Sequence, residues 1–160
     1  MMKTKNDLPS AARAKMIAVL NARLADAVDL LTQAKQAHFN VKGPAFIGLH
    51  LLFDDVAGAV YEYIDLIAER AVQLGGTAEA TARLAAGSSS LGEYPAGIVS
   101  GADHCQALSG ALAAFGKLAR QAVDKAVEFN DADTADLFTG VSRGIDKWLW
   151  FVEAHLQPAD

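Results

Sequence analysis

Four long segments of this sequence carry apolar residues at helical spacing, and this periodicity constrains the fold more than any other feature. In the first segment Ile17, Leu20, Leu24, Val28 and Leu31 recur at steps of three and four residues, which places them on one face of an α-helix. No segment has the pattern expected of a strand. We therefore predict an all-α protein whose helices bury their apolar faces against one another.

Glycine, proline and capping residues indicate where these helices begin and end. Ser10 is the expected N-cap of the first helix, and Gly75-Gly76 ends the second. Ser100 opens the third, and either Asp131 or Asp133 caps the fourth. The predicted helices run, in chain order, over 11–39, 46–74 and 100–129, and from Asp131 or Asp133 to about residue 155.

A connection of about 25 residues separates the second and third helices, and its residues 78–85 could form a short helix. At up to ~3.3 Å per residue it can return along a helix that rises only ~1.5 Å per residue. Two helical hairpins joined by one long crossover form a ferritin-like four-helix bundle. We expect this bundle over residues 11–160, after a short flexible tail at 1–10.

Composition excludes several classes of protein. Hydrophobic residues make up 52% of the chain, which supports a sizeable core, yet no run approaches the ~18 apolar residues of a membrane span. The N-terminus lacks the apolar stretch of a secretory signal. A single cysteine, Cys105, favours a reducing, cytoplasmic setting. The net charge of −5 argues against nucleic-acid binding by the body of the protein.

The predicted second helix carries His50, Asp54, Asp65 and Glu69 within one quadrant of its surface. His50/Asp54 and Asp65/Glu69 are each spaced i, i+4, so the side chains of each pair project together. Imidazole nitrogens and carboxylate oxygens suit iron, zinc or manganese. The pairs lie ~16 Å apart along the helix axis, so one ion cannot reach both on one chain.

Two unrelated clusters, or one site built by two chains, are both compatible with this spacing. The two pairs are symmetric about a point between residues 59 and 60. A two-fold axis there would bring His50 beside Glu69 of a second copy, and Asp54 beside its Asp65. Ala57 and Gly58, near the crossing, would let the backbones approach closely. In an antiparallel hairpin, His38 at the end of the first helix would lie near His50.

The same residues can also be explained without a metal site. Histidines and acids at this spacing are common on solvated helix faces, and Asp65 and Glu69 could engage Arg70. The usual bundle-core pattern for two irons, Glu-x-x-His on two helices, is absent, because Glu153-Ala154-His155 does not fit it.

Three stretches resemble the Dps family of small ferritins, named for DNA-binding proteins from starved cells: KQAHFNVKGPAFIGLHLLFDDV, YIDLIAERAVQLGG and DTADLFTGVSRGIDKWLWFVEAHLQ. The likeness covers nearly the whole chain after residue 10. It implies a ferroxidase site with His38, His50 and Asp54 from one subunit, and Asp65 and Glu69 from its two-fold mate. It also implies a homo-dodecameric shell that oxidises ferrous iron, preferably with hydrogen peroxide, and stores ferric mineral, which protects against oxidative stress.

The chain departs from the family pattern at several aromatic and acidic positions. Phe39 stands where the family often has tryptophan, and Leu51 where an acidic residue is common, with Asp55 as the candidate replacement. Trp150 matches a family tryptophan, and Trp148 stands where another aromatic is frequent. We expect both tryptophans to pack in the core, with electron donation as the alternative.

Acidic residues around the start of the fourth predicted helix are the candidates for an iron-entry pore, by the same resemblance. Negative potential would concentrate ferrous ions there. The alternatives are a helix cap and ion pairs of Asp146 with Arg143 or Lys147. His104, His155 and Cys105 have no partners at ligand spacing, and we expect them to be structural or surface residues. The candidate pore residues are Asp131, Asp133, Asp136 and Asp146.

The first fifteen residues carry most of the clustered positive charge: Lys3, Lys5, Arg13 and Lys15 against Asp7. One such tail would bind phosphate weakly, but twelve on one shell could act together. The alternative function is therefore mainly that of a DNA-binding architectural protein that protects the nucleoid.

Overall fold

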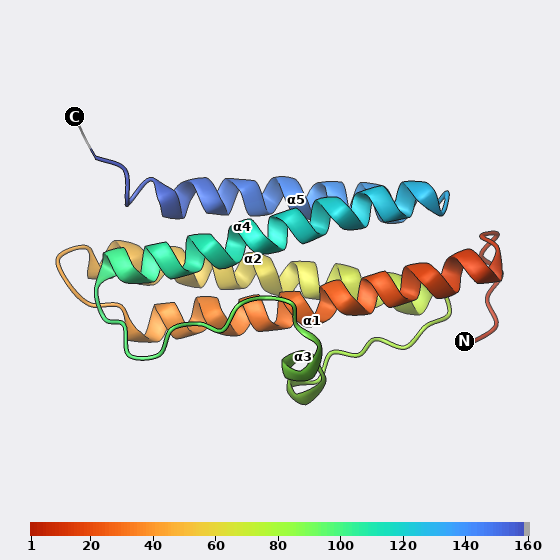
Figure 1. The fold of residues 1–160 in the computed structure, drawn as a ribbon, viewed down its shortest axis with the longest axis horizontal. Coiled ribbons are helices and arrows are strands. Elements are labelled where there is room, and N and C mark those ends of the chain that lie inside the picture. The colour runs from red at the N-terminus through yellow and green to blue at the C-terminus, as the bar shows by residue number, and fades with distance from the viewer. Residues whose placement is uncertain (159–160) are drawn as a thin grey trace.

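The computed structural model describes residues 1–158, in which four long helices form a bundle and one short helix lies outside it (Figure 1). Hairpin α1–α2 and hairpin α4–α5 make the most extensive contacts, and α1 also packs against α4. The last two residues of the predicted 11–160 bundle lie outside the described part. The helices are α1 (Ser10–Asn40), α2 (Phe46–Gln73), α3 (Ala82–Ser88), α4 (Gly101–Glu128) and α5 (Ala132–Glu153).

The capping predictions are confirmed for the second hairpin and wrong for the first helix. The Ser100 side chain accepts from the Asp103 amide at 3.1 Å, and the Asp131 carboxylate accepts from the Thr134 amide at 3.1 Å. Asp131, and not Asp133, is therefore the cap of α5. The N-cap of α1 is Pro9, without a side-chain hydrogen bond, and Ser10 is already helical. Proline fixes the φ that starts the helix.

The apolar faces of all four long helices meet in one core. Leu20 and Leu24 of the predicted stripe are fully buried, and Ile17, Val28 and Leu31 pack against them with partial exposure. The helical periodicity therefore identified the inward face of α1 correctly. None of the helices within residues 1–158 is both long enough and apolar enough to cross a bilayer.

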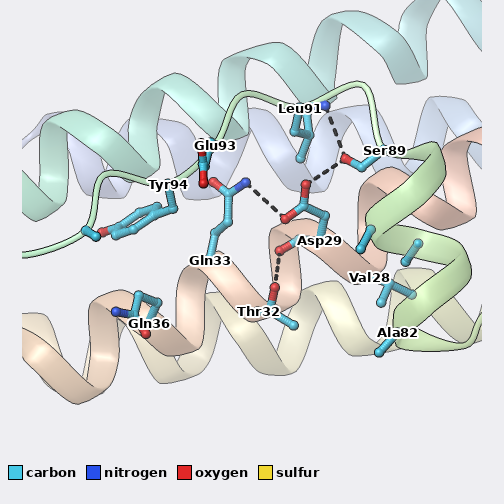
Figure 2. A pocket seen from close by; sticks show the side chains of 13 residues that line it. Val28, Asp29, Thr32, Gln33, Gln36, Ala82, Ser89, Leu91, Glu93 and Tyr94 are labelled. Carbon is cyan, nitrogen blue, oxygen red and sulfur yellow. Dashed lines mark hydrogen bonds between the residues drawn. The ribbon is translucent and has the colours of Figure 1, made fainter.

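Carboxylates of α1 hold the long crossover against the bundle. The Ser90 amide donates to Asp26 Oδ1 at 2.6 Å, and the Ser89 hydroxyl donates to Asp29 Oδ2 at 2.6 Å. Gln33 Nε2 donates to the Gly92 carbonyl at 3.0 Å. Of these residues, Asp29, Gln33 and Ser89 line a pocket of about 680 Å³ between α1, α3 and the crossover (Figure 2). The short helix occupies 82–88 instead of 78–85, because the Thr81 side chain caps it.

A buried ion pair ties the end of α2 to the α4–α5 turn. Arg70 donates to Asp131 Oδ1 at 2.7 Å and to Thr134 Oγ1 at 2.8 Å. Both charged side chains are almost fully buried, with 9% and 2% of their surfaces exposed. Removing one partner of such a pair leaves the other charge buried and uncompensated.

We expect Arg70→Met to lower the free energy of unfolding by about 3–5 kcal/mol, because Asp131 would be stranded in the interior. The matched control is Arg120→Met, whose partner Asp146 is exposed, so the expected loss is only about 0–1 kcal/mol. Urea unfolding followed by circular dichroism measures both. Equal losses in the two variants would contradict the role assigned to the buried pair.

Candidate metal centre

The hairpin between α1 and α2 brings His38 and His50 together. Their rings stack with centroids 3.7 Å apart and planes 23° from parallel. His38 Nδ1 lies 2.7 Å from the His50 carbonyl oxygen, and His50 Nδ1 lies 2.9 Å from the His38 carbonyl oxygen. The turn between them uses Gly43 with φ of 114°, a conformation that favours glycine.

These reciprocal contacts determine which nitrogen of each ring is free. A carbonyl oxygen only accepts hydrogen bonds, so Nδ1 carries the proton in both His38 and His50. Nε2 of each ring then keeps its lone pair, which is the form that binds a metal ion. The sequence predicted that the two histidines would be neighbours, but it contained no sign of what orients them.

Asp54 is paired with a lysine of α1. Lys35 Nζ lies 2.6 Å from Asp54 Oδ1, on a carboxylate that is about half exposed. The hydrogen bond and charge of Lys35 hold the pKa of Asp54 below its ordinary value of 3.8, and desolvation of the carboxylate opposes this shift only in part. Sequence reasoning missed Lys35, although its position three residues before His38 puts it on the same side of α1.

Asp65 and Glu69 are exposed further along α2, and within residues 1–158 their side chains form no hydrogen bond or ion pair. Arg70 faces inward, so the alternative pairing with it does not form. In this part of the chain no group of three or more His, Cys, Asp or Glu side chains is placed to hold a metal ion. His38, His50 and Asp54 therefore do not form a ready metal site within one subunit, and the candidate donors lie in two separate places along the chain, at 38/50/54 and at 65/69.

The surface of α2 around these donors is unusually apolar. Ile47, Leu51, Tyr61 and Leu66 are all at least half exposed, and such exposed apolar groups mark interaction surfaces. Gly58 is exposed as well, with nothing within 4 Å of the position that a Cβ would take. Ala57 was expected to share this face, but it points into the core.

The four candidate pore acids do not share one environment. Asp131 is buried and paired with Arg70, so its carboxylate stabilises the fold and is not available to line a pore. Asp146 pairs with Arg120 at 3.0 Å, instead of Arg143 or Lys147. Asp133 and Asp136 are exposed. The pore stays a prediction that now depends on the three exposed acids.

The two tryptophans, His155 and Cys105 differ in how far they are exposed to solvent. Trp148 packs partly buried against the core as expected, whereas Trp150 is 62% exposed, so core packing was wrong for it. His155 is exposed, and Cys105 is buried. Burial raises the pKa of the Cys105 thiol to about 11, so the thiolate form is disfavoured near neutral pH.

The basic residues near the N-terminus also differ in their surroundings. Lys3, Lys5 and Lys15 are exposed. Arg13 instead donates from Nε to the Leu8 carbonyl at 3.1 Å and from Nη1 to the Leu74 carbonyl at 3.0 Å. Its guanidinium holds the N-terminal segment against the end of α2, so the role of Arg13 as a DNA contact stays a prediction, on a side chain that is already bound within the subunit.

We expect Lys35→Met to raise the pKa of Asp54 towards 3.8, because the variant loses the hydrogen bond and the charge that favour the carboxylate. Carboxyl ¹³C chemical shifts of the metal-free protein measure this titration. Lys42→Met, which removes an exposed lysine from the α1–α2 turn, is the control and should leave the Asp54 titration unchanged. An unshifted pKa in Lys35→Met would contradict the assigned pairing.

Comparison with known proteins identifies relatives over nearly the whole chain. Residues 17–159 match the ferritin-like domain family. The "DNA protection during starvation protein" of Agrobacterium fabrum is 45% identical over 97% of this chain and 96% of its own. The solved DpsA14 of Streptomyces coelicolor superposes with a TM-score of 0.92 at 33% identity, over 98% of this chain and 92% of that one. Dps from Microbacterium arborescens, solved in a "high iron form", gives 0.84 at 31% identity over 98% and 99%. The chain thus belongs to the Dps family of ferritin-like proteins.

Proposed function

We propose that this protein oxidises ferrous iron at sites shared between two subunits and stores the ferric product inside a twelve-subunit shell. The observation that carries the proposal is the division of the donor set on α2. Two imidazoles with free Nε2 atoms and the Asp54 carboxylate lie near its start, and two unpaired carboxylates, Asp65 and Glu69, lie nearer its end. A two-fold axis near residues 59 and 60 joins the first set of one subunit to the second set of the other.

The surface around the axis supports such a contact. The exposed apolar side chains of α2 would be buried there, and each 100 Å² of apolar surface removed from water contributes ~2.5 kcal/mol. The open space over Gly58 allows close approach of a second helix. A relative with the same fold, Dps from Microbacterium arborescens, is described in a high iron form, which is consistent with this proposal.

The donor set suits iron as a substrate. Carboxylate oxygens with few imidazoles bind ferrous iron loosely and favour the ferric product. The Nδ1–carbonyl hydrogen bonds keep the rings of His38 and His50 oriented without any metal. The contact between Lys35 Nζ and Asp54 Oδ1 must break before that oxygen can bind an ion. Two ferrous ions per site supply both electrons that hydrogen peroxide needs, so no hydroxyl radical is released.

Entry of iron through the shell is assigned to the exposed acids of α5. Asp133, Asp136 and Asp146 would provide the negative potential that attracts ferrous ions. Asp131 would act indirectly, since its pairing with Arg70 holds this turn in place.

DNA binding is a second candidate function. Several relatives carry the description "DNA protection during starvation protein", and Lys3, Lys5 and Lys15 are exposed at the start of the chain. Twelve such segments on one shell would bind phosphates multivalently. We assign the protein to the cytoplasm on this basis, with association to the bacterial nucleoid.

A subunit-mixing experiment tests the shared site. Asp54→Asn and Glu69→Gln each place a defect in both sites of a dimer, so each variant alone should lose peroxide-dependent ferrous oxidation. A mixed dimer of the two variants has both defects in one site and an intact second site. Random reassociation of equal amounts should therefore restore about a quarter of the wild-type rate per subunit.

The oxidation rate is followed by ferric absorbance after addition of ferrous sulfate and hydrogen peroxide. The control mixes Asp54→Asn with His50→Ala, whose defects lie in the same half of the site, so no intact site forms. Native mass measurements verify the shell in every sample. A mixture of Asp54→Asn with Glu69→Gln that stays inactive would reject a site shared between two chains.

DNA binding is tested by changing the exposed lysines only. Lys3→Ala/Lys5→Ala/Lys15→Ala should weaken the mobility shift of duplex DNA and lower its dependence on salt, because fewer phosphate contacts release counterions. Lys117→Ala, on the exposed face of α4, is the control. Unchanged binding by the triple variant would exclude the N-terminal segment as the DNA contact.

A further inference from the structure

The pocket between α1, α3 and the crossover carries two acids and no basic residue on its wall (Figure 2). Its volume of about 680 Å³ is in the range of pockets that bind small ligands. The acids are Asp29 and Glu93, and neither of them forms an ion pair within residues 1–158. The pocket therefore has a negative charge that no side chain around it neutralises.

A buried glutamine in the same wall has an oxygen without a donor. Gln33 is 4% exposed, and its Nε2 donates to Asp29 Oδ1 at 3.1 Å and to the Gly92 carbonyl at 3.0 Å. Both partners only accept hydrogen bonds, which fixes the orientation of the amide. Its Oε1 therefore faces away from them, and no group of residues 1–158 donates to it. In Figure 2 this oxygen lies on the Glu93 side of the amide.

Glu93 brings a second acceptor that has no donor. Its side chain is exposed and forms no hydrogen bond within the described residues. Gln33, Glu93 and Tyr94 also line an adjoining cavity of about 210 Å³ on the α4 side, so both acceptors lie between two open spaces. An acceptor on a side chain as buried as Gln33 is unfavourable without a donor. A donor is thus what this place lacks.

Tyr94 supplies an aromatic wall beside these acceptors. Its hydroxyl lies 2.8 Å from Nδ1 of His104, which is itself 1% exposed in α4. The hydrogen bond holds the ring at the edge of the pocket, and the face of an aromatic ring attracts ammonium groups. His104 is thus buried and bound to the crossover, in keeping with the structural role expected of it.

The pocket also offers apolar contacts, from Val28 of α1, Ala85 of α3 and Leu91 of the crossover. Methylene groups pack against such side chains while their charged ends bind oxygen atoms. A bare divalent ion would leave the apolar wall unused. The described residues moreover contain no group of three His, Cys, Asp or Glu side chains that could hold such an ion. The lining therefore favours an organic cation.

We propose that this pocket binds a linear aliphatic polyamine. One ammonium group donates to Gln33 Oε1 and to the Glu93 carboxylate, next to the ring of Tyr94. A second ammonium group binds Asp29, whose carboxylate keeps lone pairs beyond those that accept from Gln33 and Ser89. In Figure 2 Asp29 lies towards α3 and Glu93 towards Tyr94, so the two ends of the amine occupy opposite parts of the pocket.

The bound amine links the crossover to α1, because Glu93 belongs to the crossover and Asp29 and Gln33 belong to α1. It would therefore hold the crossover more firmly against the bundle. None of these residues is a donor of the proposed iron site, so the inference stands apart from the oxidation of iron.

Isothermal titration calorimetry of intact, metal-free shells with spermidine tests the proposal. We expect saturable binding that Glu93→Gln weakens by at least about tenfold, because a charge-assisted hydrogen bond is lost. Glu79→Gln, on an exposed crossover residue outside this pocket, removes the same charge and should bind normally. Equal weakening in both variants would indicate attraction to the acidic surface as a whole and would overturn the proposal, as would absence of binding.

Two competitors separate a polyamine from simpler cations. Mg²⁺ at the concentration of spermidine carries charge without methylene groups and should not displace it. Lysine blocked at both backbone ends represents a lysine side chain of a protein and should bind about tenfold more weakly, because it lacks the second ammonium group. Displacement by Mg²⁺, or equal affinity for the blocked lysine, would reject a polyamine as the ligand.

Hydrogen–deuterium exchange followed by mass spectrometry locates the bound amine. Spermidine should slow exchange of the amides of residues 89–95 in the wild-type shell, and this protection should be lost in Glu93→Gln and kept in Glu79→Gln. Binding that leaves exchange in this segment unchanged would place the amine elsewhere and overturn the proposal.

Discussion

The reciprocal hydrogen bonds between His38 and His50 are the interaction on which the functional end of the molecule depends. The last carbonyls of a helix have no partner within the helix, and the carbonyl of His38 lies in the last turn of α1. The His50 ring satisfies it, while the His38 ring binds the His50 carbonyl in return. One pair of contacts therefore closes the α1–α2 hairpin, selects the tautomer of both rings and leaves both Nε2 atoms without a proton.

The acidic residues fall into two groups. Some carboxylates stabilise the fold through hydrogen bonds and ion pairs, and others are exposed and free to bind a metal ion. Asp26 and Asp29 bind the crossover, and Asp131 neutralises Arg70 within the bundle. Asp65 and Glu69 make no such contacts and stay in solvent. A carboxylate that is already bound in the interior would have to break those contacts to bind iron, whereas an exposed one only exchanges water.

Local patterns predicted much of the fold and the proximity of His38 to His50. The apolar stripe of α1, the caps at Ser100 and Asp131, and the hairpin that joins His38 to His50 all depend on spacing along the chain, which a sequence displays directly. The predictions that failed depended on neighbours. Contacts between distant residues, such as the hydrogen bond from Arg13 to the carbonyl of Leu74 sixty-one residues away, are not visible in local spacing.

The sequence by itself determined an all-α chain, the ends of most helices and a metal-type donor set divided symmetrically along one helix, because these follow from local spacing. Only the tertiary structure decided which of these side chains are paired or buried within the bundle and which face solvent. It paired Asp54 with Lys35, buried Asp131 against Arg70 and left Trp150 exposed. It also joined Tyr94 to His104, since a hydrogen bond between two helices or between a helix and a loop depends on packing that no local pattern specifies.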